Sequence, residues 1–233
     1  SGKCIAVNCT NNATLPAYTG GIIGEHSGNS AGTVIVNNCT NTGDINSEWC
    51  GGIVGPRSGR HTGSTVTIKN CKNTGDIKGG GMIGRYAGIN GGTINIINSY
   101  NTGNVISSNA GGLVARQAGG NINIDTCYSK VEINDSLSGV SGFFASDLGN
   151  NASSTNICKV KVTNCYSINT HTTTSDKNAF MCSTSSSGSE YIQILFAHSY
   201  ASGYDNGFFD NTNSLTSNSF IVITSGRFTS LLI

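Results

Sequence analysis

The chain has 233 residues, of which 11% are Asp, Glu, Lys or Arg, and its formal net charge at pH 7 is +1. Charged residues make up roughly 25% of ordinary soluble domains, so this surface must consist mainly of Ser, Thr, Asn and Gly. We expect no nucleic-acid partner, because the chain has no basic tract. We expect no membrane span either, because no apolar run approaches the roughly 20 residues that a span requires.

A unit of about 30 residues recurs along the chain, and its first copy lies within residues 1–24. Residues 8–11 read N-C-T-N, and the same four residues return at 38–41. Apolar residues alternate before each such motif, which predicts a strand with one buried face. The alternating pairs are Cys4 and Ala6, Val34 and Val36, Val66 and Ile68, Ile94 and Ile96, Ile122 and Ile124, Val160 and Val162, and Ile192 and Ile194.

Each unit continues with a corner and a further strand. The corner is N-T-G-D-I at residues 41–45 and 73–77, and N-T-G-N-V at 101–105, where Gly relieves the bend. The further strands are expected at 20–24, 51–55, 80–84, 111–115, 141–145, 178–182 and 206–210. A fixed period of this kind predicts a repeat architecture. The predicted fold is therefore an all-β solenoid, or β-helix, of about seven coils of roughly 30 residues with parallel strands stacked in ladders.

Equivalent residues of stacked coils form columns. Continuing the alternation past each strand predicts an inward amide column of Asn38, Asn70, Asn98 and Asn164, in which side chains pass hydrogen bonds from coil to coil. The next position predicts an inward column of Cys39, Cys71, Cys127 and Cys165. These thiols could be reduced and act as small apolar side chains, or neighbouring coils could form disulfides, with Cys39 and Cys71 as the first candidate pair.

The repeat resembles the GLUG family of bacterial surface proteins, in which N-C-Y-N-T-G-x-V leads to a G-G-L-V-G strand. The likeness covers residues 34–115 closely, and residues 4–24 and 122–210 more loosely. It implies a β-solenoid that serves as a stalk or passenger region of an exported protein. Such repeats are specific for the fold and uninformative about an activity.

The units become less regular in the second half of a single domain that we expect to span residues 1–233. Regular coils are expected over 1–120, and looser, Phe-rich coils with longer loops over 121–233. Within residues 146–190, two long Ser/Thr/Asn-rich loops are the candidates for a recognition role. The apolar segment 220–233 ends without a polar cap.

Few residues suggest chemistry. Asp44, Asp76 and Glu132 share one column with Asn104, and paired carboxylates could serve a glycosidase or bind Ca²⁺, although a solvated turn explains them better. The spacing of Gly79, Gly81 and Gly84 matches a dinucleotide fingerprint, but these glycines belong to the repeat. We therefore predict no catalytic residue and no cofactor.

Five N-x-S/T sequons occur in the chain. Asn12, Asn134 and Asn151 fall in expected loops and are the candidate glycosylation sites in a eukaryotic secreted protein. Asn8 and Asn38 belong to the predicted inward column and should be unmodified.

These features predict a non-enzymatic structural protein, a subunit or repeat segment of an extracellular or cell- or virion-surface fibre that assembles head to tail with itself. The alternative is an adhesin or carbohydrate-binding module that uses residues 146–190 to bind glycans or other surface proteins. Two further alternatives are a polysaccharide-degrading β-helix enzyme that uses the acid column, and an ice-binding protein that uses the column of Thr42, Thr74 and Thr102.

Overall fold

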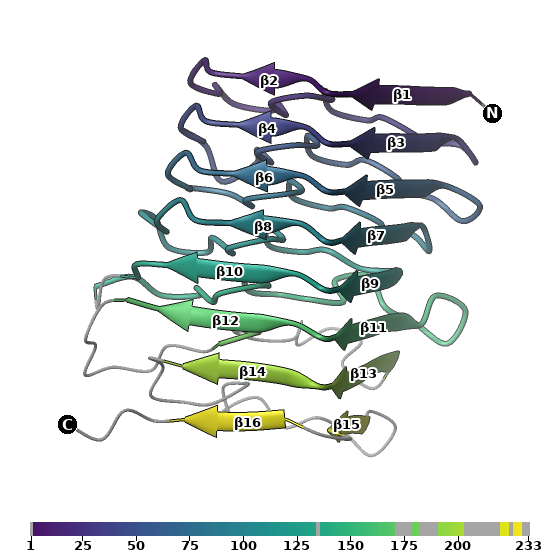
Figure 1. Ribbon diagram of the computed structural model, residues 1–233. Coiled ribbons are helices and arrows are strands. Elements are labelled where there is room, and N and C mark those ends of the chain that lie inside the picture. The colour runs from purple at the N-terminus through teal and green to yellow at the C-terminus, as the bar shows by residue number, and fades with distance from the viewer. Residues whose placement is uncertain are drawn as a thin grey trace.

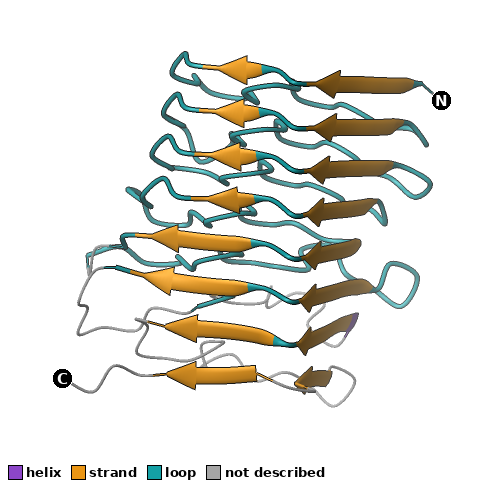
Figure 2. Ribbon diagram, viewed as in Figure 1, coloured by secondary structure: helices purple, strands orange, loops and turns teal. Residues whose placement is uncertain are grey.

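A computed structural model describes residues 2–133, 136–170, 179–181 and 191–202, together with the backbone of 220–223 and 226–229. It confirms the predicted β-solenoid (Figure 1). Strands and loops account for nearly all of the described chain (Figure 2). The strands form two parallel sheets of eight strands each, with β1 and β2 at one end of the stack and β15 and β16 at the other.

Each coil contributes one strand to each sheet. Sheet A contains, in spatial order, β1 (Lys3–Val7), β3 (Thr33–Asn37), β5 (Thr65–Lys69), β7 (Thr93–Ile97), β9 (Asn121–Asp125), β11 (Cys158–Thr163), β13 (Ile192–Ala197) and β15 (Phe220–Ile223). Sheet B contains β2 (Thr10–Asn11), β4 (Thr40–Asn41), β6 (Lys72–Asn73), β8 (Tyr100–Asn101), β10 (Tyr128–Val131), β12 (Tyr166–Asn169), β14 (Ser199–Ser202) and β16 (Gly226–Thr229). Strands pair in register with the equivalent strand of the next coil, as Val34 does with Val66 and Val66 with Ile94.

A third face closes each coil through short bridges in place of long strands. Gly20 pairs with Gly51 and Ile23 with Val54, and the series continues to the bridge between Phe144 and Met181. Six of the seven predicted third segments therefore fall in described coils. The seventh, residues 206–210, lies outside the described residues.

The core is built from the inward residues of all three faces. In sheet A, Val34, Val36 and their equivalents from β5 to β13 are buried, as the alternation predicted, whereas Cys4 and Ala6 of β1 are not. Toward β13 the core is filled by aromatic rings, with ring centroids 4.6 Å apart for Phe143 and Phe180 and 5.3 Å apart for Phe180 and Phe196. Burying one large apolar side chain contributes about 1.5 to 3 kcal/mol, so these columns supply most of the stabilisation.

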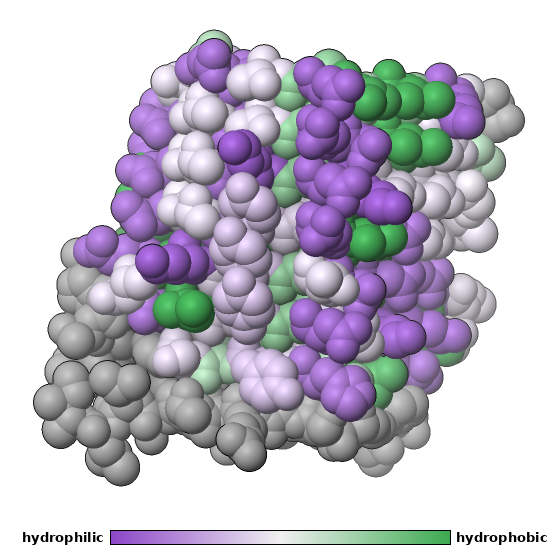
Figure 3. Space-filling view, in the orientation of Figure 1, coloured by the Kyte–Doolittle hydropathy of each residue, from purple (hydrophilic) through white to green (hydrophobic). Residues whose placement is uncertain are grey.

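The predicted inward asparagine column is wrong in its position. Asn38, Asn70 and Asn98 have φ angles of 55°, 53° and 45°, in the left-handed region that asparagine tolerates better than most residues. This conformation turns the chain between the two sheets and interrupts the alternation. Their side chains are therefore exposed at the corner, as is that of Asn164, and the residue that follows each of them points inward. The predicted hydrogen bonds between coils are present at this exposed position, from Asn38 Nδ2 to Asn8 Oδ1 and from Asn98 Nδ2 to Asn70 Oδ1, both at 2.7 Å. Figure 3 shows the corner as a hydrophilic column.

The inward amide column lies three residues further along each coil. Asn41, Asn73 and Asn101 are fully buried. The Nδ2 of Asn41 donates to Oδ1 of Asn73 at 2.6 Å, and the Nδ2 of Asn73 donates to Oδ1 of Asn101 at 2.7 Å. The prediction of an interior amide ladder is thus correct in kind, and the repeat position that provides it is the Asn of N-T-G.

Candidate functional site

The cysteine column lies inside the solenoid. Cys39, Cys71, Cys127 and Cys165 are buried, and all the described cysteines are free thiols. Burial raises the pKa of Cys71 to about 11 and also raises the pKa of Cys165. Thiols with such raised pKa values are poor nucleophiles at neutral pH, so Cys71 and Cys165 pack the corner as small apolar side chains.

The acid column lies outside and is used by the backbone. Asp44 Oδ1 accepts the N–H of Asp76 at 3.1 Å, and Asp76 Oδ1 accepts the N–H of Asn104 at 3.0 Å. Asn104 Oδ1 accepts the N–H of Glu132 at 3.3 Å. The side chains of Asp44, Asp76 and Asn104 thus each accept a backbone N–H group of the next coil, and this role is structural. Within the described residues, no group of three or more His, Cys, Asp or Glu side chains could hold a metal ion.

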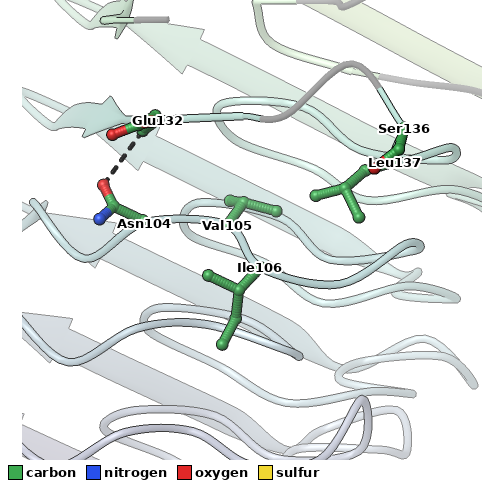
Figure 4. Close-up of a pocket in the computed structure, with 6 residues that line it drawn as sticks. All are labelled: Asn104, Val105, Ile106, Glu132, Ser136 and Leu137. Carbon is green, nitrogen blue, oxygen red and sulfur yellow. Dashed lines mark hydrogen bonds between the residues drawn. The ribbon is translucent and has the colours of Figure 1, made fainter.

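A pocket of about 320 Å³ adjoins the Glu132 end of this column (Figure 4). Its lining residues are Asn104, Val105, Ile106, Glu132, Ser136 and Leu137. Among the described lining residues, Glu132 is the one carboxylate. The pocket does not bring Asp44 or Asp76 to Glu132.

An aromatic and arginine cluster, which the sequence analysis missed, packs beside the third face. The guanidinium of Arg85 lies 4.2 Å from the ring centroid of Trp49 and 4.8 Å from that of Tyr86, and Arg57 lies 5.0 Å from Trp49. Glu48 forms an ion pair with Arg85, with 3.4 Å between Oε1 and Nη1. The guanidinium groups lie over aromatic rings of neighbouring coils, so the cluster joins successive coils by cation–π contacts.

Sheet B carries an external column of tyrosines. The rings of Tyr100 and Tyr128 stack with centroids 4.6 Å apart, and those of Tyr128 and Tyr166 with centroids 4.9 Å apart, both with an interplanar angle of 4°. Stacking buries the ring faces against each other, so this column also stabilises the coil-to-coil contact.

Besides Asn12, three sequon asparagines are exposed in the described part of the chain. Asn8 and Asn38 were expected inside, but both lie at the exposed corner. Asn151 is exposed in the first recognition loop, whose Asn156 donates to the carbonyl of Ile89 at 2.9 Å and thereby holds the loop against an earlier coil. Asn134 and most of 169–190 lie outside the described residues.

The strongest candidate site is the edge of the first coil. Within the described residues, β1 pairs with one strand, β3. Cys9 is exposed, whereas its equivalent Cys39 is buried. On the outer face Ile5 is 55% and Val7 47% exposed, and apolar residues gather over β1 and β3 (Figure 3).

In the first coil the amide ladder ends at Asn11, whose Oδ1 can accept one more hydrogen bond. Asn11 Nδ2 donates to Asn41 Oδ1 at 2.7 Å, and Asn11 Oδ1 accepts the N–H of Ala13 at 3.3 Å. In the coils below, the equivalent oxygen also accepts the amide of the preceding asparagine, as Asn73 does from Asn41. A carbonyl oxygen has two lone pairs, so Asn11 can accept the same bond from one more coil.

Comparison with known proteins leaves the family open. No family model, no curated protein and no solved structure matches the chain. The GLUG resemblance therefore stays a prediction carried by residues 34–115. No helix in the described part of the chain is long and apolar enough to cross a membrane.

Proposed function

We propose that this chain is a non-enzymatic structural segment of an extracellular or cell-surface fibre, and that its first coil stacks on a coil of another copy. The observation that carries the proposal is the set of ladders that connect coil to coil, which extends to the first described coil, where Asn11 Oδ1 can accept the bond that Asn73 Oδ1 accepts from Asn41. Exposed strand edges template the addition of further strands. Stacking between two unlike ends continues without closing unless its rotation happens to form a ring.

The internal ladders support the same proposal. Amide, thiol, tyrosine and acid columns each connect a coil to its neighbour, and their side chains are engaged in these contacts. A polymer of such coils would repeat the same contacts at the joint. The partner at the β1 edge would be a coil with an inward asparagine whose Nδ2 donates to Asn11. The expected second surface, residues 220–233, has side chains outside the described residues.

Light scattering across a range of protein concentrations, with electron microscopy of the same samples, tests the proposal. We expect size to rise with concentration and rods to appear. Ala6→Lys should abolish this growth, because Ala6 follows the inward alternation of Val36 and an inward charge at an edge blocks stacking. Ile5→Lys is the matched control, because Ile5 is exposed on the outer face of the same strand.

A wild-type chain that stays monomeric at every concentration would contradict self-assembly. Equal loss of assembly in Ala6→Lys and Ile5→Lys would also contradict stacking through the coil edge. Circular dichroism of both variants checks that the solenoid remains folded.

A further inference from the structure

Two adjoining hollows cross the outer face of sheet A, far from the β1 edge. Their volumes are about 450 and 470 Å³, and both are lined by Asn123 and Lys161. Together they extend over β9, β11 and β13, a region that is mostly hydrophilic in Figure 3. We call this region the lysine groove, and its outward polar side chains are Thr93, Asn121, Asn123, Lys159, Lys161 and Gln193.

The register of the sheet arranges these side chains in two parallel columns. Lys159 pairs with Asn121 on one side and with Gln193 on the other. Lys161 pairs with Asn123, whose Nδ2 donates to Oδ1 of Asn95 at 2.9 Å. Neighbouring strands lie about 4.8 Å apart, so the Lys159 column presents a polar group at a short, regular interval, whereas the Lys161 column ends at the apolar Leu195. The groove therefore suits an extended ligand better than a compact ion.

The charge of the groove is positive. Lys159 and Lys161 are exposed, and the ion pairs of the described residues include neither of them. Asp125 is the acid that lines the groove, and it accepts bonds from Thr163 Oγ1 at 2.5 Å and Asn164 Nδ2 at 3.0 Å. These donors hold the carboxylate against the sheet, although it still attracts Lys161. Lys159 and its amide neighbours are left to face solvent.

The backbone under the groove argues against an extended peptide as the ligand. The strands under the groove are paired on both sides within the sheet, so this face offers side chains in place of backbone N–H and C=O groups. An extended peptide is usually recognised through backbone pairing at a strand edge. The amides of Asn121, Asn123 and Gln193 each present donors and an acceptor, which match the hydroxyl groups of a sugar. A carboxylate on that sugar would meet the lysine ammonium groups.

We propose that the lysine groove binds a linear acidic polysaccharide whose sugar units carry carboxylates. The ligand would lie along the two columns, with hydroxyls on the amides and a carboxylate between Lys159 and Lys161. This role is independent of the proposed stacking at β1, so either can fail without the other.

Titration calorimetry with polygalacturonate at low ionic strength tests the proposal on the full chain. We expect binding that weakens as salt is added, because exposed charge pairs are screened. The double variant Lys159→Gln and Lys161→Gln should bind at least about tenfold more weakly, since both charge-assisted contacts are lost. The matched control is Lys69→Gln together with Lys130→Gln, two exposed lysines outside the groove, and it should bind like wild type.

The nature of the ligand has its own controls. Fully methyl-esterified polygalacturonate keeps the hydroxyls and loses the charge, so its binding should fall to the level of the double variant. Asn123→Ala should weaken binding to polygalacturonate while the charge of the groove is unchanged. No binding to polygalacturonate, equal affinity in the double variant, or equally tight binding of polyglutamate would each overturn the assignment to an acidic polysaccharide.

Discussion

Asn41 and Asn73 lie one above the other inside the solenoid, and the Nδ2 of Asn41 is 2.6 Å from Oδ1 of Asn73. The same nitrogen of Asn41 also donates to the carbonyl of Gly43 at 2.7 Å. One side chain thus closes the corner of its own coil and binds the next coil. This explains why N-T-G recurs as a unit, with the amide and the glycine in one short turn.

Removing the central amide should cost much more than removing a corner amide. Asn73 accepts one side-chain bond and donates two bonds, to Asn101 and Gly75, all of them buried. A buried polar group left unpaired costs about 1 to 3 kcal/mol, so Asn73→Ala should lower the free energy of unfolding by about 3 kcal/mol or more. Urea titration followed by circular dichroism measures the change.

The control for this prediction is Asn70, the exposed corner residue. Asn70→Gly keeps the left-handed conformation available and loses only the exposed bonds to Asn37 and Asn98, so it should be nearly neutral. Asn70→Ala should fall between the two variants, because alanine is disfavoured by about 1 kcal/mol in that region. A loss in Asn70→Gly as large as that in Asn73→Ala would place the stabilising ladder at the corner instead.

The glycine of N-T-G should tolerate no side chain. A Cβ added at Gly75 would overlap the carbonyl oxygen of Gly43 in the preceding coil. Gly75→Ala must therefore push two coils apart, and we expect a loss of about 3 kcal/mol. Gly24→Ala is the matched control, since a Cβ there meets no atom within 4 Å. Thermal unfolding of both variants gives the comparison, and equal melting temperatures would show that coil spacing at this corner is not tight.

Alkylation should separate the cysteines by position. Cys4 and Cys9 are exposed and should react with iodoacetamide in the native protein, whereas Cys71 and Cys158 should react after denaturant is added. Burial raises the pKa of Cys71 to about 11 and that of Cys158 to about 12, so little thiolate exists at neutral pH even during brief opening. Peptide mass spectrometry assigns each label, and fast native labelling of Cys71 would mean that the column is accessible.

The same reagent reports on the proposed fibre. Stacking of a further coil on β1 would cover Cys9, which should then become protected as assembly proceeds. Protection should be absent in Ala6→Lys at equal concentration.

Acid should weaken the contact between β9 and β11. Hydrogen bonds, that from Thr163 foremost, lower the pKa of Asp125 below its ordinary value of about 3.9. The folded state therefore binds the proton less readily than the unfolded chain. The resulting stabilisation is present above pH 3.9 and is lost as pH falls through the lower, folded pKa.

Asp125→Asn should remove this part of the acid dependence. The variant should be less stable than wild type at neutral pH, and the difference should shrink as the pH falls below about 4. Melting temperatures from pH 7 to pH 2 measure it. A constant difference over that range would mean that ionisation of Asp125 does not contribute to stability.

The alternation of apolar residues predicted the strands of sheet A because a parallel sheet over a core needs every second side chain buried. It could not predict the orientation of Asn70, because the left-handed residue at the corner interrupts the period of two. The recurrence of N-T-G was visible in the sequence. Whether this motif forms an amide ladder depends on which asparagine of the unit points inward. The left-handed turn that precedes the motif determines this orientation.

Period and alternation, which can be read along the chain, predict a parallel β-solenoid with inward aliphatic and cysteine columns, because every unit repeats one strand pattern. The burial of particular asparagines, the bonds from the acids to backbone N–H groups, and the groove that Lys159 and Lys161 share with Asn123 emerge only once the coils are stacked. Those relationships join residues about 30 or more positions apart. They depend on the register of one coil over the next, and that register is set by the packing of the whole stack.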